Sequence, residues 1–213
     1  MVTETMIQNT VSNLQKNNFS VYVAETKEEG AQIVCSLIDD GATIGVGGSA
    51  TIDQLDILDG LDAKGHLIFN HNKPGISPQQ LLDFRRRQLL CDVFLTSTNA
   101  LSETGELINI DGFGNRVAAL SFGPKRVIVA AGINKITPVV ESGIARVKNI
   151  AAPMNAKRLF DIGRLKKAPP CVKTGHCVDC RGPERICTIT TVTNRRPFLT
   201  DIHIVLVKEE LGF

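Results

Sequence analysis

The chain has 213 residues, of which 43% are hydrophobic and 22% charged, with a formal net charge of +2. These values are typical of a soluble globular domain with a core of its own. The longest apolar run, residues 127–133, is too short to span a bilayer, and residues 1–15 lack the apolar stretch of a signal peptide. We therefore predict a cytoplasmic protein without a membrane span.

The charge is distributed unevenly along the chain. Residues 157–196 hold ten Lys or Arg and three Asp or Glu, whereas the remainder is acidic overall. Such a segment favours an anionic ligand, an acidic partner or an anionic metal–thiolate centre. Aromatic residues are few and follow no stacking pattern, so nucleic acid is not an expected partner.

Apolar periodicity predicts helices that alternate with short strands. The expected helices cover residues 2–16, 26–40, 49–58, 77–90, 116–120, 137–147 and 153–160. The expected strands cover 19–24, 42–46, 67–69, 92–96, 126–131 and 203–207, with a hairpin of 100–103 and 106–110 turning at Thr104-Gly105.

This alternation predicts a single α/β domain over residues 1–213. Its sheet should be open and mostly parallel, with helices on both faces. Residues 163–196 differ in composition, being rich in Cys, Pro and basic residues, and we interpret them as a small metal-binding insertion near the C-terminus.

The first candidate site lies in residues 45–50, Gly-Val-Gly-Gly-Ser-Ala, between a predicted strand and a predicted helix. Glycines there let the backbone approach a ligand, and a helix N-terminus offers free N–H groups to an anion. The pattern matches a dinucleotide fingerprint, but the position about twenty residues on lies near Asn70 rather than at an acid. We predict a general anion or carboxylate site at Gly47, Gly48 and Ser49. A plain turn capped by Ser49 is the alternative.

The second candidate site is a polar stretch after the strand over 92–96. Its ligand-binding candidates are Asn99, Gly112, Gly114 and Asn115. Gly112, Gly114 and Asn115 could equally serve a sharp turn and a helix cap.

Three charged residues are the catalytic candidates of this region. Arg116 falls in the first turn of a helix, where its charge opposes the dipole, so it should pair with an acid or an anionic ligand. Lys135 follows another strand and can reach the same crevice, unless it is a solvated surface lysine. Asp111 is the candidate for proton transfer.

The most specific pattern is the C-x5-C-x2-C-x6-C spacing of Cys171, Cys177, Cys180 and Cys187. Four thiolates in so short a segment can close around one ion or cluster, and in a reducing compartment disulfides are not expected. A [4Fe–4S] cluster and a zinc ion use the same ligands. Zinc sites more often show two C-x2-C pairs, and this segment has one, so we favour the iron–sulfur cluster and keep zinc as the alternative.

The sequence resembles the lactate-utilisation (LUD) domain family. The resemblance lies in residues 45–51, 99–119, 122–135 and 146–158, in the cysteine segment, which is similar to that of a subgroup, and in the closing Glu-Leu-Gly-Phe. It implies an open α/β fold like that of the sugar-isomerase and CoA-transferase superfamily, with the site at the strand ends. It also implies a link to bacterial oxidation of L-lactate to pyruvate, in which iron–sulfur or flavin subunits are the expected partners.

These observations favour a redox protein that carries an iron–sulfur centre and holds a small carboxylate such as lactate, as a component of an oxidoreductase. A homo-oligomer is compatible with this interpretation. Two alternatives remain. The first is a non-enzymatic assembly or electron-transfer subunit, and the second is a zinc-stabilised transferase or isomerase that acts on an anionic substrate.

Overall fold

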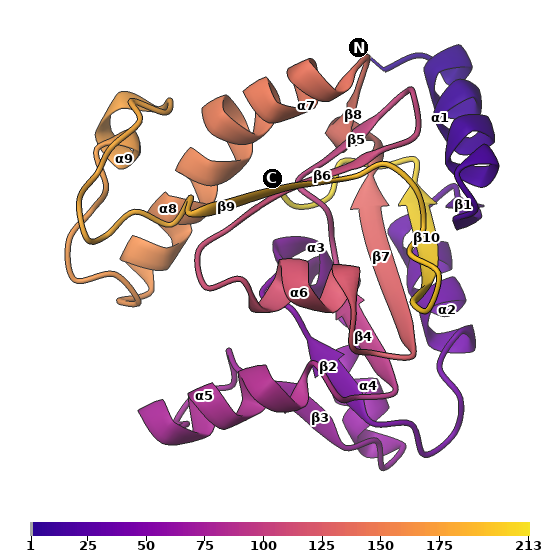
Figure 1. Cartoon of the computed structure of the whole chain (residues 1–213). Helices are drawn as coiled ribbons and strands as arrows, with labels where there is room; N and C mark the ends of the chain where they lie inside the picture. Colours follow the sequence, from indigo (N-terminus) through magenta and orange to yellow (C-terminus); the bar gives the residue numbers. More distant parts are fainter. Residues whose placement is uncertain (1) are drawn as a thin grey trace.

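The computed structural model describes residues 2–213 and contains two sheets (Figure 1). The larger sheet has six strands in the order β1-β10-β7-β4-β2-β3, and every neighbouring pair is parallel. Its strands are β1 (Ser20–Ala24), β2 (Ile44–Val46), β3 (Ile68–Asn70), β4 (Val93–Thr96), β7 (Arg126–Gly132) and β10 (Asp201–Val207). The predicted open, mostly parallel sheet is confirmed.

A smaller, mixed sheet with the order β8-β5-β6-β9 packs beside the first. Its strands are β5 (Ala100–Ser102), β6 (Leu107–Asp111), β8 (Ile136–Thr137) and β9 (Ile189–Thr193). β5 and β6 are antiparallel, which confirms the predicted hairpin, and Gly105 in its turn has a φ of +96° that favours glycine.

Helices cover both faces of the larger sheet because its inner strands are apolar on both sides. Along β7, Val127 and Val129 face a core shared with α1 (Glu4–Lys16), α5 (Pro78–Arg87) and α6 (Asn115–Ser121). Ile128 and Ala130 face the opposite core, shared with α2 (Lys27–Ser36), α3 (Ala50–Leu55) and α4 (Leu58–Ala63).

Several predicted helix boundaries differ from the structure for local reasons. The expected helix over 49–58 is two helices, α3 and α4, because Asp56 adopts a left-handed φ of +51° between them. Thr137 belongs to β8 and does not cap a helix. The segments predicted as two helices, 137–147 and 153–160, are instead joined: α7 (Val140–Arg146) runs through a π-helical turn, η2 (Val147–Ala151), into α8 (Ala152–Asp161).

The segment over 163–196 is only partly an appendage. Residues 171–174 form a short helix, α9, which packs against α8 and lies beyond it in Figure 1. Near the C-terminal end of the segment lies β9, an edge strand that pairs antiparallel with β6 from Asp111 to Leu107. Strand pairing therefore fixes the cysteine segment to the end of β6, where the second candidate site was predicted.

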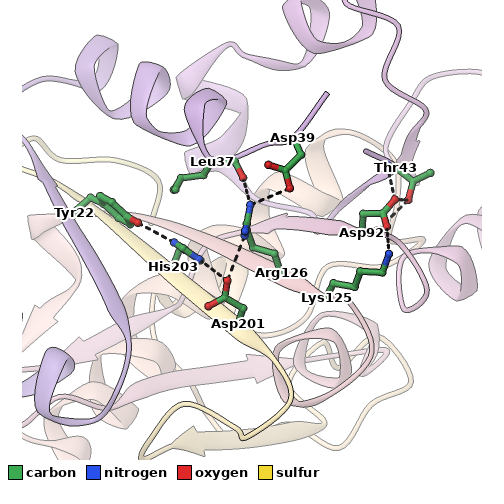
Figure 2. A network of polar contacts seen from close by, with 9 residues as sticks. All are labelled: Tyr22, Leu37, Asp39, Thr43, Asp92, Lys125, Arg126, Asp201 and His203. Carbon is green, nitrogen blue, oxygen red and sulfur yellow. Dashed lines mark hydrogen bonds and ion pairs between the residues drawn. The ribbon is translucent and has the colours of Figure 1, made fainter. Parts of the chain in front are cut away.

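The amino ends of the strands are closed by a polar network (Figure 2). Asp201 at the start of β10 accepts from Arg126 at 3.4 Å and contacts the Nε2 of His203 at 2.7 Å, and the other ring nitrogen of His203 lies 3.1 Å from the Tyr22 hydroxyl. Asp92 accepts from Lys125 at 2.7 Å and from Thr43. These contacts fill the amino edge of the sheet, so a ligand site is to be sought at the carboxyl edge.

Within residues 2–213, no helix is both long enough and apolar enough to cross a membrane.

Candidate functional site

A cavity of about 540 Å³ lies at the carboxyl edge of the larger sheet. The loops after β2, β4 and β7 form its inner wall, α8 and the segment that follows it form another wall, and the cysteine segment covers one side. The predicted ligand-binding and catalytic residues that line it are Gly48, Ser49, Asn99, Asp111, Gly112, Asn115, Arg116 and Lys135, and the predicted metal ligand Cys187 lines it as well. The structure thus brings both predicted polar stretches together.

Two predicted ligand residues, Gly47 and Gly114, do not line the cavity. A Cβ at Gly47 would lie 3.0 Å from both the Phe94 ring and the Thr96 hydroxyl, so this glycine permits close packing of the strand-to-helix turn. Gly114 precedes α6 with a φ of +86°, and its Cβ would lie 2.9 Å from Ile189. In the structure both glycines are needed for the path of the backbone, because a side chain at either position would meet its neighbours.

Ser49 caps α3 by accepting the Ile52 N–H at 3.3 Å, which is the structural role considered for it. Gly48, beside it, makes room for two side chains that the sequence did not single out. A Cβ at Gly48 would lie 3.2 Å from the Asn72 amide nitrogen and 3.6 Å from Nε2 of His71. The glycine turn therefore brings His71 and Asn72 to the cavity wall.

The orientation of His71 is set by a buried amide. Gln88 has no exposed surface, and its amide nitrogen lies 2.8 and 2.9 Å from the carbonyl oxygens of Phe69 and Val46 and 2.9 Å from Nδ1 of His71. Asn115 donates to the Gln88 amide oxygen at 3.3 Å. An amide nitrogen can donate but not accept, so Nδ1 is the unprotonated nitrogen of the neutral ring and Nε2 carries the proton on the cavity side. Burial, followed by the charges of Arg85 and Arg164, lowers the pKa of His71 to about 4, so the ring is neutral at pH 7.

Arg116 connects the two sheets through hydrogen bonds. Its terminal nitrogens donate to Asn99 Oδ1 and the Ile110 carbonyl, each at 2.9 Å, to the Ser97 carbonyl at 3.2 Å, and to Asn109 Oδ1. These four acceptors account for the hydrogens of both terminal nitrogens. Burial lowers the pKa of Arg116, opposed by the charge of Asp111, yet the guanidinium stays charged and adds a positive field to the cavity.

Asp111 holds the turn that leads into α6. Its Oδ2 accepts the backbone N–H groups of Arg116 at 3.1 Å and Val117 at 3.2 Å, and its Oδ1 accepts that of Gly112 at 2.9 Å. The carboxylate thus caps α6 from outside the helix, in place of Asn115, and lies where it complements the helix dipole. These bonds occupy both oxygens and leave Asp111 less free for proton transfer than predicted.

Lys135 is not the solvated lysine that was the alternative prediction. It lies in a short 3-10 helix, η1 (Ile133–Lys135), directly after β7, and only 3% of its surface is exposed. Nζ donates to the hydroxyls of Thr51 and Ser97, each at 2.8 Å. Burial first, then the charges of Arg146 and Arg116, lower the pKa of Lys135 to about 7.

The outer part of the cavity is strongly basic. Arg85, Arg158, Arg164 and Arg185 join Arg116 and Lys135 along the lining, against two carboxylates, Asp111 and Glu184. The guanidinium of Arg85 stacks 3.8 Å above the ring of Phe113, and within the described chain its buried Nε has no hydrogen-bond partner. A site with this balance of charge favours anions.

The four predicted metal ligands line one small cavity of their own, together with Lys148, Pro153 and Pro169. All four thiols are free, and the Cys177 N–H donates to the Lys148 carbonyl in η2 at 3.1 Å. Arg185 donates at 2.6 Å to the carbonyls of both Cys180 and Cys187. As the side chains stand, no group of three or more His, Cys, Asp or Glu in residues 2–213 is arranged to hold a metal ion.

The thiols influence one another electrostatically. Burial first, then the neighbouring Cys177 and Cys171, raise the pKa of Cys187 to about 11, and burial followed by Cys180 raises that of Cys171. The thiols are therefore close enough for the charge of one thiolate to raise the pKa of the next. A bound cation would lower these pKa values instead.

The cysteine cavity and the basic cavity share a wall. Arg185, Ile186 and Cys187 line both, as does Ala152 of α8. The cysteine segment therefore faces the candidate ligand site directly.

Several residues of the cavity were not predicted from the sequence. They are His71, Asn72, Arg85, Asn155, Arg158, Arg164 and Arg185. The run Arg85-Arg86-Arg87 on a predicted helix was the available signal for Arg85, since one or two of three successive helical residues can face one site. The others come from separate segments that only the folded chain brings together.

Together these features define an α/β domain with a basic pocket at the carboxyl ends of its parallel strands and a cysteine segment on the pocket wall. The family model of the LUD domain matches residues 7–207, and the chain belongs to this family. A crystal structure of a DUF162 family protein from Deinococcus radiodurans superposes with a TM-score of 0.56 at 14% sequence identity, covering 97% of this chain and 99% of that one. The two share a fold. No curated protein matches the chain.

Proposed function

We propose that this LUD-domain chain binds a carboxylate-bearing ligand in the basic pocket and holds an iron–sulfur centre on Cys171, Cys177, Cys180 and Cys187, as a component of an oxidoreductase acting on a small carboxylate such as lactate. The single observation that carries the proposal is the shared wall. Cys187 and Arg185 line both the cavity of the four thiols and the cavity of the five arginines and Lys135.

The chemistry of the ligand set supports the cluster. Four free thiols line one cavity, and the cationic Arg185 lies among them, which suits the net negative charge of a thiolate-bound centre. A zinc ion would use the same four ligands, and the single C-x2-C pair in the segment favours the cluster.

Such a cluster, when bound, supplies one-electron transfer. Oxidation of a 2-hydroxy acid to a 2-oxo acid releases two electrons and two protons. A flavin or further iron–sulfur subunit is therefore part of the proposal as the electron-transfer partner.

The residues of this chain bind and orient the ligand. The inner pocket offers the neutral Nε2–H of His71 and the Asn72 amide as donors, while Arg116 contributes charge without a free hydrogen. A cavity of about 540 Å³ exceeds the needs of a three-carbon acid and is in the range of larger ligands. A small carboxylate would occupy the inner end, and the outer arginines remain for a second anionic group.

Metal analysis of anaerobically purified protein tests the cluster. We expect iron and acid-labile sulfide in the wild type and in Cys35→Ser, whose thiol lies on α2 away from the segment, and their loss in Cys177→Ser. One equivalent of zinc without iron would contradict the proposal and favour a zinc-stabilised transferase or isomerase.

Thermal shift with lactate and with neutral lactamide tests the pocket. We expect stabilisation by lactate alone, because the pocket favours the carboxylate charge. Equal shifts with both compounds, or none with either, would contradict a carboxylate site.

A further inference from the structure

The environment of Lys135 has no role in the binding of an iron–sulfur centre, and it is unusual for a lysine. The amine is buried to 3% exposure at the inner end of the pocket, and within residues 2–213 it forms no ion pair. A buried charge without a partner is costly, so the neutral amine is the favoured form.

The two hydroxyls that hold the amine leave its lone pair free. Ser97 donates its own hydrogen to the Thr98 carbonyl at 3.3 Å, and Thr51 donates to the Leu211 carbonyl at 3.4 Å. Both hydroxyl oxygens are therefore acceptors toward Nζ. A neutral amine has two hydrogens, which these two bonds use, and among residues 2–213 its lone pair then has no hydrogen-bond donor.

Two arginines close to Lys135 oppose its protonation and are themselves fixed. Arg146 donates to the carbonyls of Asn99 at 2.7 Å, Asn134 at 3.0 Å and Phe213 at 3.2 Å, and Arg116 is held by the four acceptors described above. After burial, the charges of Arg146 and Arg116 lower the pKa of Lys135 further. Fixed cations beside a desolvated amine are a known means of activating lysine as a nucleophile. The same cations would attract a carboxylate on the ligand.

We propose that Lys135 is a nucleophile that condenses with the carbonyl group of a 2-oxo acid, such as pyruvate, to form an imine. This inference rests on the carboxylate pocket of the proposed function. The Nζ lone pair forms a bond to the carbonyl carbon, and the carbonyl oxygen leaves as water with the two amine hydrogens. Hydrolysis reverses the step, and no oxidant or reductant is consumed. The pocket thereby distinguishes a 2-oxo acid from the corresponding 2-hydroxy acid by a covalent bond.

Trapping with pyruvate and sodium cyanoborohydride tests the proposal on the wild-type chain. The reductant converts an imine to a stable secondary amine, and peptide mapping by mass spectrometry locates it. Lys125 is the internal reference, because it is exposed at the opposite edge of the sheet and paired with Asp92 at 2.7 Å, which raises its pKa. Only a neutral amine reacts with the carbonyl group, and at pH 7.5 a far larger fraction of Lys135 than of Lys125 is neutral. We therefore expect labelling of Lys135 to exceed that of Lys125 by at least about tenfold.

Two controls separate this inference from the proposed function. Lys135→Met removes an unpaired buried amine, so the variant should fold, and it should lose the fast-labelled peptide. Lactate has a hydroxyl in place of the 2-oxo group and cannot form an imine, so its binding tests the carboxylate pocket alone. If lactate stabilises the chain but pyruvate labels Lys135 no faster than Lys125, the imine is wrong and the carboxylate pocket stands. If neither acid stabilises the chain and Lys135 is not labelled, both proposals fail.

Discussion

Thr188 donates its backbone N–H to the carbonyl oxygen of Asp111 at 2.9 Å, and its hydroxyl lies 2.5 Å from the Gly112 carbonyl oxygen and 3.0 Å from that of Asp111. Thr188 directly follows the last cysteine of the metal-binding candidates, and Asp111 caps α6 at the pocket. The last thiol and the pocket wall are therefore fixed to each other by the backbone. This relationship makes changes at the pocket wall measurable at the cysteine segment.

Gly112 tests this connection. A Cβ at Gly112 would lie 3.1 Å from the Ile186 carbonyl, so Gly112→Ala should displace the segment beside Cys187. We expect a loss of about 1–3 kcal/mol in the free energy of unfolding, measured by chemical denaturation, and a lower retained metal content. Gly182→Ala is the matched control, because a Cβ there meets no atom within 4 Å. Equal behaviour of the two variants would show that the two regions are not coupled in this way.

His71 should make stability depend on pH. Its pKa is lowered from 6.5 to about 4 in the folded chain, so between these values the unfolded chain binds a proton that the folded chain does not. Stability therefore falls as the pH drops, by about 2 kcal/mol from pH 7 to pH 5.

Urea unfolding at several pH values measures this effect. His71→Gln should flatten the profile, whereas His176→Gln, at an exposed histidine, should leave it unchanged. A profile for His71→Gln that parallels the wild type would refute the assignment.

Lys135 should have an effect at higher pH. Its pKa is lowered from 10.5 to about 7, so the unfolded chain binds the extra proton across this window and stability rises with pH. The contribution is about 2 kcal/mol between pH 7 and pH 9.

Lys135→Met should remove this rise and stabilise the chain at pH 7, with Lys167→Met, at an exposed position, as the control. The measurement is the difference in unfolding free energy between variant and wild type at each pH. A difference that does not change with pH would contradict a buried, neutral amine.

The outer arginines should select ligands with more than one negative charge. We expect a dicarboxylate to bind more tightly than lactate, and Arg164→Gln to weaken it by about tenfold at low salt, as loss of a charged hydrogen-bonding partner does. Arg87→Gln is the matched control, since Arg87 pairs with Asp83 at 2.7 Å and does not line the cavity. Calorimetric titration would decide the matter, and equal loss in both variants would argue for a general surface effect.

The sequence predicted the parallel sheet well because its signals are local. Short apolar strands such as Arg126–Gly132, and the start of a helix at Ser77, depend on neighbouring residues alone. β9 was missed because residues 189–193, although all β-branched, lie in the stretch assigned to the cysteine-rich insertion, and it is pairing with β6 that makes them part of a sheet. The two helices predicted over 137–160 were joined for a related reason: Pro153 is accommodated in the first turn of α8, after the π-helical turn.

In the site, too, features that depend on neighbouring residues were predicted, and features that depend on distant residues were not. The glycine turn, the polar stretch and the cysteines were recognised because their residues are close in the sequence. The state of Lys135 could not be predicted, since it depends on Thr51, Ser97 and Arg146, which come from three other segments. The roles of Arg116 and Asp111 changed for the same reason. Their hydrogen bonds to neighbouring strands and to α6 are visible only in the folded chain.

We propose that a redox centre on the four cysteines lies against the carboxylate pocket. The most direct test is the electron paramagnetic resonance spectrum of the dithionite-reduced chain, prepared anaerobically, with and without a saturating carboxylate whose binding is verified by thermal shift. We expect the signal of a reduced iron–sulfur cluster whose shape changes when the ligand binds, because Cys187 and Arg185 border both cavities. Verified binding with no cluster signal, or with a signal that the ligand leaves unchanged, would contradict this proposal.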